Sequence, residues 1–400
     1  MDSSQCLGDR FRGFPSYILL ASCVTLLAFY ASQPGSLDDT FILLVYVRHF
    51  VESSQLYYNV SDGAVDGFTS VLDLILKSSV FSLFGGDLLL LNWIVTVSCM
   101  LGASAVGASL LLILRSSFSC YVSLPFMIVA ISTLSLNPGL AEGATFLLEV
   151  PLFLVLFLTL LLLCITQKEL PVVFGSLLFL LFLARPEGLV YGGVLLLYCR
   201  LLSFSRKFFI TSSSIFIALS VGYLFWHFSY FGHVAPNTYY AKTSSCFSCE
   251  LNDGFVNASR FVFLLGGGGI GGAVLALPLF SYFILQSHRR AYWGLWLLLV
   301  ASFGIVIVEG GDSYQLTRFF APAYAVGVIA VCFGYFASIS SRGKRCFLFL
   351  LVLICLFAFF PASVGGYKRL SYGETRERRW PLSEDDFECE REYAMKLKQK

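Results

Sequence analysis

The sequence predicts an all-α polytopic membrane protein. Of its 400 residues, 57% are hydrophobic and 13% are charged, and the mean hydropathy is +0.78. Soluble chains of this length are less apolar. Apolar runs close to the roughly 20 residues that cross a bilayer recur along the chain. Backbone groups in lipid must bond internally, and no strand-like alternation is visible, so these runs are expected to be helices.

The first apolar run extends from Phe14 to about Ala31 and follows Arg10 and Arg12. This pattern fits either a signal peptide or a first membrane span. The following "FYASQ" is a poor cleavage site because it lacks the usual small residues. We therefore expect a retained anchor with a cytoplasmic N-terminus, which places the next segment outside.

Residues 34–87 are predicted to form the first external loop. Two segments in it are expected to lie in the membrane interface rather than to cross it. The second is Val71–Phe84, which is short and contains Asp73 and Lys77. The other segment precedes it and is expected to be a helix. Its apolar positions are Phe41, Leu44, Val45, Val47 and Phe50.

Ten further spans are expected, which makes about eleven in total. They are Leu88–Leu114, Tyr121–Leu136, Thr145–Ile165, Val172–Ala184, Leu189–Leu202, Phe208–Tyr230, Phe261–Leu285, Tyr292–Val308, Phe319–Ala337 and Phe347–Phe360. Residues 1–363 thus form one transmembrane domain, and residues 364–400 form a short charged external tail.

The distribution of basic residues supports this topology. With this number of spans, the basic clusters between them fall on one side, as the positive-inside rule requires of the cytoplasmic side. These clusters are Arg10/Arg12, Arg115, Lys168, Arg206/Lys207, His288–Arg290 and Arg342–Arg345. The predicted location is the inner membrane, with the active site and the C-terminus on the periplasmic or external side.

Polar clusters gather on the opposite, external side. They are the Asp38/Asp39 loop and residues 137–143, 184–188, 232–259 and 309–320. Three of the basic residues there, Arg185, Lys242 and Arg318, run against the charge rule. Charges at membrane depth are costly and mark candidate functional sites. Together they indicate an anionic ligand at the outer face.

Several of these segments also resemble the motifs of one family. "SLDDTFILLVYVRHFVESSQLYYN" with "VDGFTS", then "TFLLEVPLF", "ARPEG", "PNTYYAKT" and "GGDSYQLTRFFAP" occur in the family's order over about residues 15–325. The chain is therefore similar to bacterial membrane glycosyltransferases of the GT-C fold. This group contains the mycobacterial terminal arabinofuranosyltransferases and the flagellar motor control protein ZomB. The chain departs from the family's motifs at two places. "VESSQ" lacks the glycine that is usual before "LYYN", and Leu148 stands where the family has a glycine.

The resemblance implies a GT-C bundle and a polyprenyl-phosphate sugar as donor, with the sugar passing to a cell-envelope acceptor. It implies an inverting displacement in which Asp38 is the general base. Asp39 would orient the base, bind the sugar or bind a metal. The resemblance fixes no cofactor, and the candidate is a divalent cation. Tandem aspartates also occur as helix N-caps, which is the structural alternative.

The leaving phosphate requires positive charge, and Arg185, Lys242 and Arg318 are the candidates to bind it. Arg185 can instead snorkel to the interface, and the other two can be ordinary loop charges. The candidates for sugar or acceptor binding are Glu149, Glu187, Asn237, Tyr239, Tyr240 and Asp312. The acidic residues can alternatively hold the cationic side chains, Glu149 can be buried and neutral, and the tyrosines can belong to an aromatic belt.

Other classes receive weaker support. No basic tract with interleaved aromatic residues predicts nucleic-acid binding, and the histidines show no metal-binding spacing. Cys246 and Cys249 can pair in an oxidising compartment. The main alternative function is a non-catalytic regulatory or assembly protein on the same scaffold. A transporter is disfavoured because the polar residues cluster at the outer ends of spans rather than in their middle.

Overall fold

The computed structural model describes residues 14–31, 38–59, 61, 63–118, 124–234, 236–237, 247–261, 282–310, 318–338 and 341–364. Apart from short 3-10 turns and an isolated β-bridge between Ile284 and Ser338, the regular elements in these ranges are α-helices. They are α2 (Phe14–Ala31), α3 (Asp38–Ser53), α4 (Val71–Phe84), α5 (Leu88–Ser117), α6 (Leu124–Ser135), α7 (Pro138–Thr145), α8 (Val150–Ile165), α9 (Pro171–Ala184), α10 (Gly188–Leu201), α11 (Arg206–Phe231), α13 (Phe247–Arg260), α15 (Arg289–Val308), α16 (Ala321–Ala337) and α17 (Ser341–Val364).

Each predicted span that falls mainly on described residues overlaps a helix, whereas Phe261–Leu285 lies almost entirely outside them. Four helical segments are long and apolar enough to cross a membrane, namely α5, α11, and residues 286–308 and 318–337. The α6–α7 pair, bent by 42°, adds a fifth if it counts as one span. α2, α8, α9 and α10 are shorter apolar helices. The total of about eleven crossings therefore stays a prediction.

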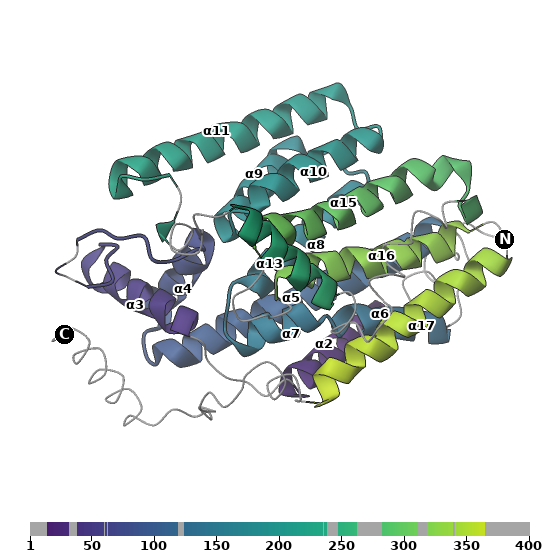
Figure 1. The fold of residues 1–400 in the computed structure, drawn as a ribbon, viewed down its shortest axis with the longest axis horizontal. Coiled ribbons are helices and arrows are strands. Elements are labelled where there is room, and N and C mark those ends of the chain that lie inside the picture. The colour runs from purple at the N-terminus through teal and green to yellow at the C-terminus, as the bar shows by residue number, and fades with distance from the viewer. Residues whose placement is uncertain are drawn as a thin grey trace.

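The long helices lie alongside one another in a bundle (Figure 1). α5 packs on α8 and α2, α9 packs on α11, and α16 packs on α15 and α17. One large apolar cluster, which includes Phe157, Tyr198 and Phe347, runs through these helices. α3 and α4 pack on each other at one end of the bundle, beside the C-terminal end of α11 (Figure 1).

α11 shows why the fold belongs in a membrane. It is apolar along most of its length, yet its side chains Ile210, Ile217, Val221 and Phe225 are exposed. A helix that is apolar beyond the face that it buries is expected against lipid, because a soluble monomer rarely exposes such a patch. The protein is a multi-pass membrane protein.

α3 and α4 confirm the two helices predicted in the first loop. They share a small core of Leu43, Tyr46, Val47, Phe68 and Leu74, separate from the main cluster. The predicted apolar face of α3 is partly wrong because Phe50 is 36% exposed, whereas Leu43 and Tyr46 are buried. The core forms on the face that meets α4.

The segment after α6 also differs from the prediction of a polar loop and one continuous span. Asn137 caps a short helix, α7, by accepting a hydrogen bond from the Leu140 amide, and Pro138 occupies the first turn. The helix ends before Leu147, whose φ is +56°. The predicted span Thr145–Ile165 therefore begins only at Val150, and Glu149 lies in the turn before it.

Close approach between α10 and α15 gives a test of the packing. A methyl group added at Gly294 would overlap the ring of the buried Tyr198, whereas one added at Gly304 on the same helix would meet nothing within 4 Å. Gly294→Ala is expected to lower the free energy of unfolding by about 1–3 kcal/mol. Gly304→Ala is expected to change it by less than about 1 kcal/mol, in the stabilising direction. Denaturation in detergent micelles measures both, and equal stabilities would contradict the packing.

Candidate active site

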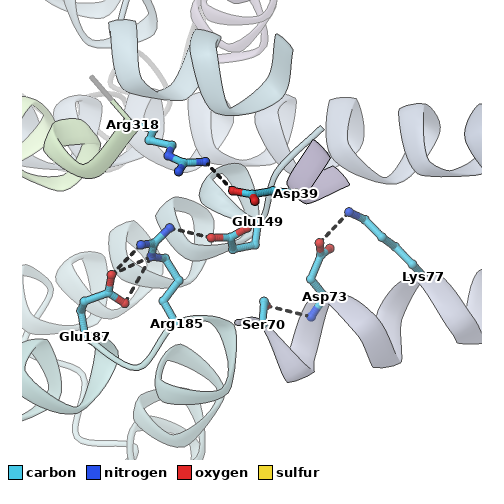
Figure 2. Close-up of polar contacts among 8 residues, drawn as sticks. All are labelled: Asp39, Ser70, Asp73, Lys77, Glu149, Arg185, Glu187 and Arg318. Atoms are coloured by element: carbon cyan, nitrogen blue, oxygen red, sulfur yellow. Dashed lines mark hydrogen bonds and ion pairs between the residues drawn. The ribbon is translucent and has the colours of Figure 1, made fainter. Parts of the chain in front are cut away.

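Four turns that are distant in sequence bring charged side chains together. They are the start of α3, the α7–α8 turn, the α9–α10 turn and the turn before α16, and Figure 2 shows the contacts. The charged side chains involved are Asp39, Glu149, Arg185, Glu187 and Arg318. Each motif is separated from the next by at least one helix, so only the fold assembles them.

Arg185 lies at the centre of this group. Its Nη1 is 2.6 Å from Glu149 Oε1, and its Nε and Nη2 donate to Glu187 Oε1 at 3.1 and 2.5 Å. The side chains of Arg185 and both glutamates are at most 14% exposed. The local sequence explains the position, because Pro186 follows Arg185 and favours the extended backbone in which α9 ends.

These contacts favour the charged forms of Arg185 and Glu187. Burial by itself would lower the pKa of Arg185, but the carboxylates of Glu187 and Glu149 raise it. Burial would likewise raise the pKa of Glu187, whereas the Arg185 guanidinium holds that pKa below its ordinary value. Arg185, Glu149 and Glu187 form a triad held together by these contacts.

Arg318 extends the group toward α3. Its Nη1 lies 3.6 Å from Asp39 Oδ2, a longer contact than those of Arg185. The Arg318 side chain is 4% exposed and that of Asp39 is 39% exposed. Both guanidiniums lie over the ring of Phe319, at 4.6 Å for Arg185 and 5.2 Å for Arg318. Asp39 thus connects the start of α3 to the buried arginines.

α3 and α4 fix the α7–α8 turn that carries Glu149. Thr40 donates a hydrogen bond to the Phe146 carbonyl oxygen at 2.5 Å, and Lys77 donates to that of Leu147 at 3.3 Å. Lys77 is itself paired with Asp73 at 2.5 Å, and both side chains are nearly inaccessible (Figure 2). The pair that was predicted on an interfacial helix is therefore buried and positions the site.

A small, mostly apolar pocket opens beside the triad. It is lined by Val150, Phe153, Arg185, Glu187, Tyr191, Ile305, Val306, Glu309, Arg318, Phe319 and Pro322. Apolar walls with a few convergent charges are typical of a ligand site. Sequence reasoning missed Glu309, Phe319 and Tyr191 as lining residues. Glu309 directly follows an apolar helix. A charged residue at the end of an apolar helix is the sequence signal by which it could have been found.

The other predicted site residues are distributed as follows. Asp38 is the first residue of α3, one position before Asp39. The backbone N–H of Asn237 donates to the Asp66 carbonyl oxygen at 3.0 Å, and Asn237 is not among the residues that line the pocket. The remaining predicted residues, Tyr239, Tyr240, Lys242 and Asp312, lie outside the described residues, as does Cys246.

Because Arg185 is buried in the triad, its removal is expected to destabilise the protein more than removal of an exposed arginine. Arg185→Met leaves two buried carboxylates without their cation and is expected to lower the free energy of unfolding by about 3–5 kcal/mol. Arg48 is the matched control, because it pairs with Glu52 at 2.9 Å while 63% exposed. Arg48→Met is expected to cost less than about 1 kcal/mol. Similar losses for both variants in detergent denaturation would show that the Arg185 pairs are not buried.

Comparison with known proteins identifies the fold. No protein-family model and no curated protein matches the chain. The crystal structure of the apo form of the Archaeoglobus fulgidus oligosaccharyltransferase is similar to it with a TM-score of 0.51 and 13% sequence identity. The match covers 95% of this chain, which spans 59% of the length of that one. The chain therefore has a GT-C-like membrane fold, as the sequence predicts.

Proposed function

We propose that the protein is an integral membrane glycosyltransferase that takes a sugar from a polyprenyl-phosphate donor and transfers it to an acceptor glycan, lipid or protein on the outer face of the membrane. The observation that carries the proposal is the contact of Asp39 with Arg318, beside a pocket that also contains Arg185. The GT-C-like fold, shared with an oligosaccharyltransferase, supports transfer of a sugar in general.

In the proposed reaction, an acceptor hydroxyl attacks the anomeric carbon of the donor sugar. Its proton passes to the carboxylate of Asp38, and the bond between the anomeric carbon and the phosphate oxygen breaks. The phosphate keeps the electron pair and leaves as polyprenyl phosphate. Because the hydroxyl attacks from the opposite face in a single displacement, the anomeric configuration inverts. General-base assistance of this kind contributes about 10²- to 10⁴-fold to the rate.

The geometry suggests how the donor phosphate enters. Arg185 is bound by two carboxylates at 2.5–2.6 Å, whereas Arg318 and Asp39 are 3.6 Å apart. A phosphate can accept two parallel hydrogen bonds from a guanidinium, whereas the contact between Arg318 and Asp39 is longer than a hydrogen bond. We expect the donor phosphate to displace Asp39 from Arg318. Glu149 and Glu187 then hold Arg185 in place rather than bind sugar hydroxyls.

The proposed roles of the remaining residues follow the sequence resemblance. Lys242 would add positive charge for the phosphate, and Tyr239, Tyr240, Asn237 and Asp312 would contact the sugar or the acceptor. Asp39, once released from Arg318, would orient Asp38 or bind a divalent cation. The tail of the polyprenyl donor would lie in the bilayer beside the apolar helices.

The test is transfer of a labelled sugar from a panel of polyprenyl-phosphate sugars by the purified protein, with native lipid extract as acceptor. Asp38→Asn is expected to lower kcat by about 10²- to 10⁴-fold while leaving the thermal unfolding profile unchanged. Glu52→Gln is the matched control, since it changes an exposed carboxylate on the same helix and should retain wild-type transfer.

Two outcomes would contradict the proposal. Equal transfer by the wild type and Asp38→Asn would keep the enzyme and remove Asp38 as its base. Absence of transfer from every donor, by protein that elutes as a folded species, would favour the non-catalytic regulatory or assembly protein on the same scaffold.

A further inference from the structure

A second group of polar side chains lies away from the arginine pocket. It joins Asp66, in the segment between α3 and α4, to His227 on the last turn of α11 and to His233 just beyond that helix. One potential ligand atom from each of the three residues lies within 4.8 Å of the other two. Among the residues that the structure describes, this is the place where three metal-ligating side chains meet.

The backbone brings the two histidines together. Gly232 ends α11 in the left-handed conformation, with φ +81°, and its amide donates to the Phe228 carbonyl oxygen at 2.8 Å. A side chain would be strained at this φ, so glycine permits the reversal. His227 Nδ1 then lies 2.8 Å from the His233 carbonyl oxygen.

Asp66 is held from the other side by α3. The Tyr46 hydroxyl donates to the Val65 carbonyl oxygen at 2.7 Å, and the Gly67 amide donates to the Tyr46 oxygen at 3.0 Å. A Cβ at Gly67 would lie 2.8 Å from that oxygen, so the chain passes here only without a side chain. Asp66 is consequently fixed with its carboxylate directed at α11.

Hydrogen-bond accounting shows that a proton or a metal ion must lie between His227 and Asp66. A carbonyl oxygen only accepts, so His227 Nδ1 carries a proton and donates it to His233. In a neutral imidazole, Nε2 would then be an acceptor, yet it lies 2.7 Å from Asp66 Oδ2, which also accepts. A proton between the two atoms, carried by either of them, or a metal ion in that place resolves the conflict.

Two observations favour a metal over a proton. Asp66 Oδ1 is buried and has no hydrogen-bond partner, although a buried carboxylate oxygen is normally bonded. A proton on His227 would satisfy Oδ2 and leave Oδ1 alone. In addition, a histidine that donates Nδ1–H to a backbone carbonyl and directs Nε2 at a carboxylate has the arrangement of a metal ligand with its supporting bond.

We propose that Asp66, His227 and His233 bind a zinc ion. Two imidazoles and one carboxylate suit zinc, whereas magnesium and calcium prefer ligand sets made of oxygen. Tetrahedral zinc holds its ligand atoms about 3.3 Å apart, which the present separations reach with small side-chain movements. Asp66 Oδ1 or a water molecule completes the coordination.

The ion would cross-link the segment between α3 and α4 to the C-terminal end of α11. That segment follows α3, which begins with Asp38 and Asp39, so the zinc would hold the first loop of the chain against the bundle. Its role is structural, and the proposal does not depend on the proposed glycosyl transfer.

The test is zinc binding by the full chain in detergent, purified without a polyhistidine tag and dialysed against zinc at pH 7.5. About one zinc per chain is expected by elemental mass spectrometry, with no equivalent retention of magnesium. His233→Gln removes one ligand but keeps the carbonyl that His227 binds, and should weaken zinc binding at least about tenfold. Asp66→Asn should do the same. His49→Gln, whose imidazole binds the Tyr57 carbonyl oxygen elsewhere, is the control and should retain zinc.

Cobalt substitution reports the coordination geometry itself, in addition to the amount of metal retained, and the thermal unfolding profile of His233→Gln shows whether the variant is folded. Wild-type protein is expected to show the visible absorption of four-coordinate cobalt, and His233→Gln is expected to lose it. The proposal is overturned if the wild type retains no more zinc than His233→Gln. The group would then be a protonated histidine paired with an aspartate.

Discussion

The site depends on the pairing of charges that the fold removes from water. A lone guanidinium in apolar surroundings costs several kcal/mol, so Arg185 is stable in its position only because Glu149 and Glu187 contact it. The same requirement applies to Lys77 and Asp73 beneath the α7–α8 turn. These pairs connect turns from different parts of the chain, and the ends of α8, α9 and α10 are therefore set by electrostatics as well as by packing.

Within this network, the Asp39–Arg318 contact is the adaptable part. The triad of Arg185 is buried and closely bonded, whereas Asp39 is more than a third exposed and 3.6 Å from its partner. The described part of the site contains two guanidiniums and four carboxylates, those of Asp39, Glu149, Glu187 and Glu309. An anionic donor must therefore compete with a carboxylate for Arg318. In the proposed function, this competition couples donor binding to the release of an aspartate next to the base.

Much of the fold follows from local sequence signals. Apolar runs give the helices, and Asn137 with Pro138 gives a start signal for α7 that a reading by hydropathy alone overlooks. Motif order selected Asp39, Glu149, Arg185, Glu187 and Arg318, which the structure brings together. It also selected Asn237, which instead bonds to the Asp66 backbone. The meeting of Asp66 with His227 was not predictable, because spacing along the chain carries no information on contacts between distant segments.

The most direct test of this account is the affinity of the detergent-solubilised protein for polyprenyl phosphate, the leaving group of the proposed reaction, measured for the wild type and for Arg318→Gln. A charge-assisted contact predicts at least about a tenfold loss of affinity in the variant, while Arg48→Gln, with its exposed arginine, binds as the wild type does. Equal affinities for all three proteins would contradict the assignment of Arg318 to the donor phosphate and, with it, the proposed site.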